Sequence, residues 1–338
     1  MWCMHQSTKY DQKTRVKWMP HCMWAFAAGA IAMLPAFVAA QGFPTKPITV
    51  IYPFPPGNPA ENKLRVMYAE AAKTLGQPIV TEYRPGAGGR LGVVAVQKAP
   101  PDGYLLSFAT DSVLTVASQA SPTFHPQVER DYVAIHAPYA VSLTIVSHPS
   151  LPFRDARGWI EYAKANPGKL TYASQGIGGS QHLNMEQATG ALGISMTHVP
   201  YGATQMMPDM LSGTVSMTLF GLITVKQHID AGKLIAIATS GPSRSPLLPN
   251  VPTLKELGYD VSAQSWTAIV GPPGLPAETV NRLNAALNAA QKTPEIAKML
   301  ASDDSYVSLA TPQAITAQIR SEYDKMGPLV RRLNLKFD

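Results

Sequence analysis

Three glycine-rich loops hold the residues of this sequence that could bind a ligand: Pro53–Asn58, Gly86–Gly92 and Tyr172–Ser180. Each loop follows a predicted strand and precedes a predicted helix. Backbone N–H groups at the N-terminus of a helix attract an anion. In the third loop, the hydroxyls of Ser174 and Ser180 could hold a carboxylate beside such groups, and Ser180 is placed to cap the helix. The loops therefore predict binding of a small anion.

Simpler interpretations of the first two loops stay open. Gly86–Gly92 could be a plain tight turn. It is not a dinucleotide-binding fingerprint, because Leu91 stands where that fingerprint needs its third glycine. Prolines stiffen the first loop, so it can present backbone donors with little ordering cost on binding. Phe54 within it is either a core residue or a wall of the pocket.

Patterns for catalysis or metal binding are weak. His182 and Glu186 lie four residues apart on one predicted helix face. This spacing could suit a metal site or an acid–base pair, but a packed histidine beside a surface carboxylate is the favoured interpretation. Gly178–His182 does not have the Gly-x-Ser-x-Gly pattern of a hydrolase nucleophile elbow. We therefore predict a binding protein with no catalytic residues, no metal and no cofactor, and a periplasmic hydrolase is the less favoured alternative.

Strands and helices alternate along the chain, which predicts parallel sheets. Apolar runs predict strands at residues 48–52, 79–83, 104–108, 171–173, 197–199, 215–219 and 234–238. The segments Val141–Ser147 and Trp266–Val270 are expected to cross between two halves of the protein. The predicted fold is α/β, with lobe 1 formed by residues 41–140 and 267–338, lobe 2 by residues 141–266, and a ligand cleft between them.

The N-terminus has the pattern of a secretory signal peptide. Basic residues precede an uncharged apolar run, Met23–Ala40, that ends in small residues. We expect cleavage near Ala40, which removes residues 1–40, and the true start codon could follow Met1. A transmembrane anchor is the alternative, but the run is short for a bilayer and Pro35 interrupts it.

Loss of this segment changes the composition. It carries four Lys/Arg residues and Asp11, so the 28 basic and 22 acidic residues become 24 and 21, a net charge of +3. No Lys/Arg cluster remains that could follow a phosphate backbone, so we expect no nucleic-acid partner. Cys3 and Cys22 are lost with the segment, which excludes disulfides and cysteine-ligated metals from the exported protein.

From about Pro44 to the C-terminus, several motifs together resemble the periplasmic solute receptors of tripartite tricarboxylate transporters, the Bug family. Each motif is weak alone, but their order and spacing are specific. They are Lys46–Ile48, Pro53–Gly57, Leu75–Pro78, Arg84–Gly89, Pro101–Tyr104, Gly178–Leu183, Val199–Tyr201, Leu248–Thr253 and Trp266. The resemblance implies a type II periplasmic-binding-protein fold that closes on its ligand.

The resemblance also implies a function. The protein would be a monomeric periplasmic receptor that captures a small carboxylate solute by lobe closure and delivers it to the membrane permease subunits of such a transporter. A ligand-sensing module for a signalling partner is the alternative. Carried over by position, the ligand-binding residues would be Phe54, Pro56, Gly57, Asn58, Gly86, Ala87, Gly88, Gly89, Ser174, Gly178, Gly179, Ser180 and Tyr201.

Five positions depart from the family pattern. Charged family residues are replaced by glycine at Gly202 and Gly221, which predicts room for a bulkier or less charged solute. The other departures are Asn58 for a glycine, Glu61 for an aspartate and Tyr83 for an asparagine.

Overall fold

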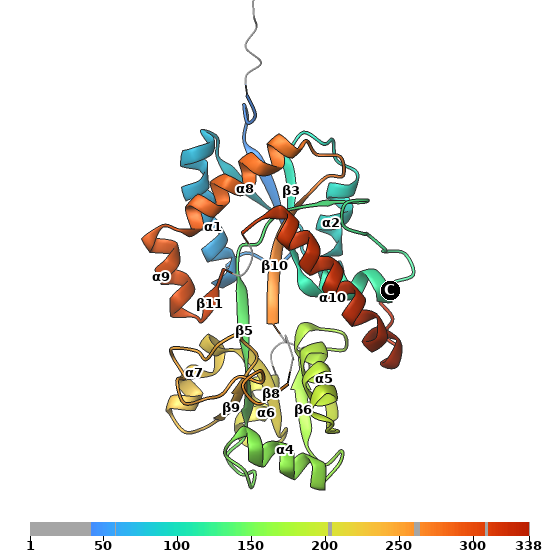
Figure 1. Cartoon of the computed structure of the whole chain (residues 1–338), viewed down its shortest axis with the longest axis vertical. Helices are drawn as coiled ribbons and strands as arrows, with labels where there is room; N and C mark the ends of the chain where they lie inside the picture. The colour runs from blue at the N-terminus through green and yellow to red at the C-terminus, as the bar shows by residue number, and fades with distance from the viewer. Residues whose placement is uncertain (1–41, 58, 202–204, 260–263, 308–309, 338) are drawn as a thin grey trace, which may run out of the picture. The chain divides into compact units, whose positions relative to one another are not determined.

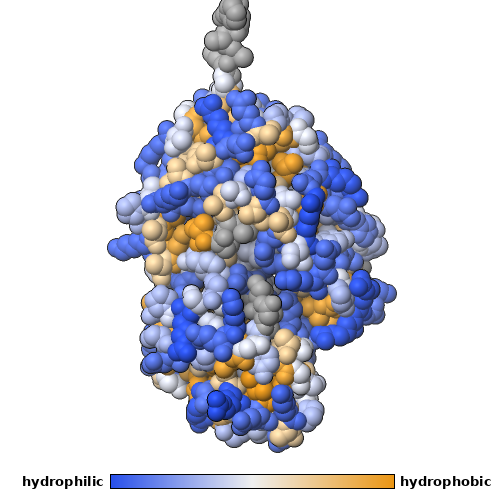
Figure 2. Space-filling view, in the orientation of Figure 1, coloured by the Kyte–Doolittle hydropathy of each residue, from blue (hydrophilic) through white to orange (hydrophobic). Residues whose placement is uncertain are grey.

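The computed structural model describes residues 42–57, 59–201, 205–259, 264–307 and 310–337, and Figure 1 shows them as two α/β lobes. The predicted signal peptide, residues 1–40, lies outside the described residues. No helix within those ranges is long and apolar enough to cross a membrane. On the face drawn in Figure 2, hydrophilic residues cover most of the surface and apolar residues form small separate groups.

Lobe 1 is a mixed sheet covered by helices on both faces. Its three parallel strands are β1 (Ile48–Tyr52), β2 (Ile79–Tyr83) and β3 (Leu105–Thr110), and β10 (Gln264–Gly271) and β4 (Val133–His136) join antiparallel. The covering helices are α1 (Pro59–Leu75), α2 (Arg90–Gln97), α8 (Ala277–Gln291), α9 (Pro294–Ser302) and α10 (Pro312–Arg332).

The side chains of β10 show why this sheet is buried on both faces. Ile269 packs in one core cluster with residues of α1, α8 and α9, whereas its neighbours Ala268 and Val270 pack in another with residues of α2 and α10. Successive side chains of a strand point to opposite faces. A strand between two helical layers must therefore be apolar throughout, as the sequence indicated.

Lobe 2 repeats this arrangement with a smaller sheet. β6 (Thr171–Ser174) lies parallel to β7 (Thr197–Pro200) and β8 (Met217–Gly221), while β8 and β9 (Ile235–Thr239) pair antiparallel with β5 (Ala140–Ser147). Its helices are α4 (Ala156–Ala165), α5 (Ser180–Leu192), α6 (Met206–Ser212) and α7 (Leu222–Asp230).

Two adjacent strands connect the lobes. The start of β5, Ala140–Ser142, pairs antiparallel with the start of β10, Gln264–Trp266, and the short strand β11 (Ser305–Tyr306) adds to the same part of β5. Figure 1 shows β5 and β10 running from one lobe toward the other. The two-lobed α/β fold is thus as expected, while the lobe boundaries at 140/141 and 266/267 fall within these strands and stay a prediction.

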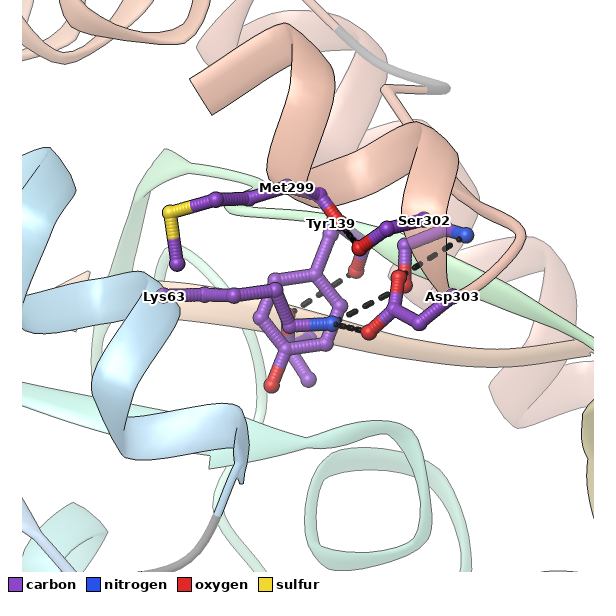
Figure 3. Close-up of polar contacts among 7 residues, drawn as sticks. Lys63, Tyr139, Met299, Ser302 and Asp303 are labelled. Atoms are coloured by element: carbon purple, nitrogen blue, oxygen red, sulfur yellow. Dashed lines mark hydrogen bonds and ion pairs between the residues drawn. The ribbon is translucent and has the colours of Figure 1, made fainter. Parts of the chain in front are cut away.

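A buried lysine ties α1 to this connection. Figure 3 shows the Lys63 side chain reaching from α1 to Asp303 and lying beside the ring of Tyr139. Lys63 Nζ lies 2.5 Å from Asp303 Oδ2, donates to Ser305 Oγ at 2.9 Å, and is 4.1 Å from the centroid of the Tyr139 ring. Tyr139 precedes β5, so the ammonium group joins α1, β11 and a lobe-connecting strand.

One helical segment was missed by the sequence analysis. After β3 the chain forms a π-type turn, Val113–Ala117, followed by α3 (Ser118–Ala120). β-branched residues such as Val113 lose side-chain freedom in a helix, so local propensity gives no signal here. All five residues of the turn are buried, and this tertiary packing overrides the propensity.

Candidate functional site

A cavity of about 290 Å³ lies between the second and third glycine-rich loops. It brings together lobe 1, lobe 2 and the C-terminal tail of the chain. Among the described residues, its lining is formed by Ala87, Gly88, Arg90, Ser112, Val113, Ala117, Ile177, Gly178, Gly179 and Phe337. Four of these, Ala87, Gly88, Gly178 and Gly179, belong to the predicted ligand-binding set.

The second loop depends on its glycines. Gly86, Gly88 and Gly89 have φ of 125°, 60° and 96°, which L side chains rarely adopt. A Cβ on Gly89 would lie 3.2 Å from Val113 Cγ2 and 3.5 Å from Pro53, so the loop packs against both the cavity wall and the first loop. Close packing of this kind fixes the backbone that faces the cavity.

Arg90, at the end of this loop, places a positive charge on the cavity. Its Nε donates to the carbonyl oxygen of Ala87 at 2.9 Å, and its Nη1 donates to Ser121 Oγ at 3.2 Å. Two bonds of this kind restrict the guanidinium group, which would lower the ordering cost of holding an anion. The sequence analysis did not include Arg90, although its place at the start of α2 was visible.

The third loop is held by two histidines. The Ser174 hydroxyl donates to the carbonyl oxygen of Gly176 at 3.0 Å and lies 2.7 Å from His198 Nε2. The Gly178 N–H donates to His182 Nδ1 at 3.0 Å. The two imidazole rings stack with centroids 4.0 Å apart. The conformation of the third loop therefore depends on the protonation state of both imidazole rings.

Both imidazoles are kept neutral by their surroundings. Burial lowers the pKa of His198 to about 4, and the neighbouring His182 adds to this. Burial also lowers the pKa of His182. Protonation of His182 at Nδ1 would remove the acceptor for the Gly178 N–H. Ser174 is fully buried. Its hydroxyl holds the loop in place through the hydrogen bond to Gly176.

The other predicted residues of lobe 2, Ser174, Ser180 and Tyr201, are not among the described residues that line this cavity. Ser180 does not cap α5, because the N-cap residue is Gly179. Instead, the Ser180 hydroxyl accepts from Asn184 Nδ2 at 3.0 Å. Tyr201 donates its backbone N–H to the carbonyl oxygen of Ser174 at 2.8 Å, which braces the third loop from β7. Roles of Ser180 and Tyr201 in ligand binding stay a prediction.

The first loop is stabilised by two of the family departures. Tyr83 donates its hydroxyl to Glu61 Oε1 at 2.5 Å, and the Gly57 N–H donates to Glu61 Oε2 at 2.6 Å. The hydrogen bond from Tyr83, followed by that from Gly57, lowers the pKa of Glu61. Glu61 thus links the first loop to Tyr83 at the end of β2.

Three predicted residues of the first loop do not belong to the cavity's described lining: Phe54, Pro56 and Gly57. Phe54 is half-buried and packs against the lobe 1 core, with its ring 5.5 Å from that of Tyr52. Pro56 and Gly57 are exposed. Asn58, like Gly202, lies outside the described residues. Ligand contacts of this loop stay a prediction.

A narrow second space adjoins the cavity and shares Ser112 with it. Two carboxylates of lobe 1, Asp111 and Glu322, face Ser180 and Asn184 of lobe 2 across it. Glu322 Oε2 accepts from Trp266 Nε1 at 2.5 Å. Burial, with the charge of Glu322 in second place, raises the pKa of Asp111 to about 8. Asp111 is therefore largely protonated near pH 7, and this side of the site holds two buried carboxyl groups.

Among the described residues, no group of three or more His, Cys, Asp or Glu side chains could hold a metal ion. Glu186, the partner of His182 in the i, i+4 pattern, instead accepts from the Tyr172 hydroxyl at 2.8 Å and pairs with Arg332 at 3.0 Å. These bonds account for Glu186 as part of the contact between α5 and α10.

The class of protein follows from this geometry: two α/β lobes, joined by paired strands, place glycine-rich loops around a small cavity, as in solute-binding proteins. The model of the "Tripartite tricarboxylate transporter family receptor" matches residues 64–335. The chain belongs to this family of periplasmic solute receptors.

Known relatives cover most of the chain. It is 34% identical to the "UPF0065 protein in gbd 5'region" of Cupriavidus necator, over 83% of this chain and 85% of that one. It is 32% identical to Protein BugT of Bordetella pertussis, over 91% and 95%.

Two solved structures share the fold. The Rhodopseudomonas palustris protein Rpa4515, solved with adipate, is 25% identical with a TM-score of 0.71, over 87% of this chain and 99% of that one. MatC from the same organism, with bound malate, is 25% identical with a TM-score of 0.68, over 85% and 100%.

Proposed function

We propose that this protein is a periplasmic receptor that binds a small carboxylate-containing solute between its lobes and delivers it to a tripartite tricarboxylate-type permease. The observation that carries the proposal is the cavity between Ala87–Arg90 and Ile177–Gly179, with Arg90 on its wall. Relatives solved with adipate and malate show that similar chains hold carboxylates. Export, with cleavage near Ala40, and a monomeric state belong to the same proposal.

The hydrolase alternative has one supporting feature, the 2.7 Å separation of Ser174 Oγ and His198 Nε2. This is the distance of a nucleophile from its base. However, Ser174 is fully buried, and its hydroxyl already donates to Gly176. A substrate carbonyl could not reach the oxygen without opening of the loop. The pair therefore supports a structural role better than a catalytic one.

Binding would act through closure of the lobes. A ligand that touches both loops favours the conformation in which they are close. The Leu183 side chain of lobe 2 already packs in one apolar cluster with Val116, Met326 and Leu335, so the lobes have a surface on which to meet.

Mass spectrometry of the solute retained by gently purified protein, residues 41–338, tests this proposal. We expect a carboxylate, and we expect small-angle scattering to show a smaller radius of gyration when it is added back. Cells that lack the gene should fail to take up the same compound. A solute without an anionic group, or steady turnover of the bound compound, would contradict the proposal.

A further inference from the structure

Besides the Ser112 hydroxyl, the described lining of the cavity contains a charged side chain and apolar side chains. Arg90 is the one charged residue among the described residues that line it. Val113, Ala117, Ile177 and Phe337 provide apolar surface. A cation with restricted geometry next to apolar walls suits a ligand with one anionic group and a hydrocarbon body.

We propose that the solute is a monocarboxylate with an apolar body, and that Arg90 and Phe337 select it. This inference rests on the proposed receptor function and makes it more specific. It separates the protein from its relatives solved with adipate and malate. Both of those ligands are dicarboxylates.

A second carboxylate in this cavity would be poorly compensated. A buried charge is costly unless it is paired, and the described lining offers no cation besides Arg90. On the side of Ser112, the neighbouring space holds Asp111 and Glu322, and its described lining includes no cation. Glu322 is held there as an acceptor by Trp266 Nε1. These acids leave the apolar walls as the favourable place for the rest of the ligand.

Phe337 forms its part of the wall through the C-terminal tail. Its N–H donates to the carbonyl oxygen of Ala120 at 3.0 Å, which fixes the end of the tail on lobe 1. Its ring lies against Gly178 of lobe 2 so closely that a Cβ there would be 2.2 Å from Cζ. The ring therefore contacts the ligand-binding loop of the other lobe and limits the cavity on that side.

The volume agrees with a small ligand. At about 290 Å³, the cavity is at the lower end of the range of roughly 300–1,000 Å³ that is usual for small-molecule sites. A single aromatic ring or a short alkyl chain with one carboxylate is the size expected.

Matched ligands test this selection directly. Hexanoate and adipate have the same six-carbon chain and differ in the second carboxylate, benzoate supplies a ring, and hexanamide lacks the charge. Isothermal titration calorimetry at pH 7.5 would measure their binding to residues 41–338. We expect hexanoate or benzoate to bind at least tenfold more tightly than adipate or malate, and hexanamide to bind at least tenfold more weakly than hexanoate.

Variants assign the selection to the two residues. Arg90→Gln should weaken monocarboxylate binding at least tenfold, about 1.4 kcal/mol, while the exposed control Arg157→Gln on α4 should leave it unchanged. Phe337→Ala should weaken hexanoate and benzoate at least tenfold, and Phe337→Leu should restore most of the hexanoate affinity. Thermal unfolding without ligand checks that each variant is folded.

The outcomes separate the two proposals. Failure of every carboxylate to bind the wild type would overturn the receptor function itself. Binding of adipate or malate as tightly as hexanoate, with carboxylate binding otherwise intact, would overturn only the monocarboxylate inference. Unchanged hexanoate affinity in folded Phe337→Ala or Arg90→Gln would overturn the role of that residue.

Discussion

Replacement of Gly178 by alanine tests the contact between the third loop and the C-terminal tail. Gly178 has a φ of +74°, and an added Cβ would lie 2.2 Å and 2.6 Å from two atoms of the Phe337 ring. The backbone conformation alone costs an L-residue roughly 1–2 kcal/mol. Overpacking adds about 1–3 kcal/mol. Gly178→Ala should therefore reduce the free energy of unfolding by about 2–5 kcal/mol.

A double-mutant cycle separates the two causes. In a Phe337→Ala background the ring is gone, so Gly178→Ala should cost only the backbone part, roughly 1–2 kcal/mol, and the coupling should be about 1–3 kcal/mol. Gly193→Ala is the matched control, because Gly193 has a φ of +64° and nothing lies within 4 Å of its added Cβ.

Urea denaturation followed by circular dichroism would give the four free energies of the cycle and that of the control. The reasoning is wrong if Gly178→Ala costs no more than Gly193→Ala, or if its cost is the same with and without Phe337. Either result would mean that the ring does not lie on Gly178 in the populated state of the protein.

Three further predictions concern buried charge. Lys63→Met should reduce the free energy of unfolding by about 3 kcal/mol, because it leaves the Asp303 carboxylate without its cation. The control Lys226→Met, in a more exposed pair, should reduce it by less than about 1 kcal/mol. Equal losses in urea denaturation would contradict this. The pKa of Asp111 in the folded state, about 8, lies above its usual 3.8, so the folded state binds more protons and stability should fall as pH rises from about 4 to 8. Asp111→Asn should flatten this fall in thermal melts. An unaltered pH profile in the variant would count against this prediction. Burial lowers the pKa of His136 to about 3, and neither of its ring nitrogens has a hydrogen-bond partner among the described residues. The unfolded state therefore binds more protons below pH 6.5, so stability should drop as pH falls from 6.5 toward 3, and His136→Phe should reduce that acid loss in the same melts; a steeper loss would refute it.

The fold was predictable because its pattern is strong. Strands that are buried on both faces give apolar runs such as Ile48–Tyr52, and glycine directly after helices such as α1, α5 and α6 marks their ends. The π-type turn Val113–Ala117 was not predictable, since its stability comes from burial and its residue types favour strands.

The site was only partly predictable for a related reason. Glycine-rich loops are visible in sequence, and they led to Ala87, Gly88, Gly178 and Gly179. Ser112 and Phe337 carry no local signal, because they reach the cavity through tertiary packing of segments distant in the chain. The apparent family departures Glu61 and Tyr83 also make sense only when their hydrogen bond is seen.

Phe337 reaches the cavity from a segment beyond α10 that is neither helix nor strand, and this has a practical consequence for handling the protein. Its backbone is tied to lobe 1 by the bond to Ala120, and its ring lies on Gly178 of lobe 2. A protease that cut the chain between α10 and Phe337 would therefore remove one wall of the cavity. Intact mass should be checked before an apparent lack of ligand binding is interpreted.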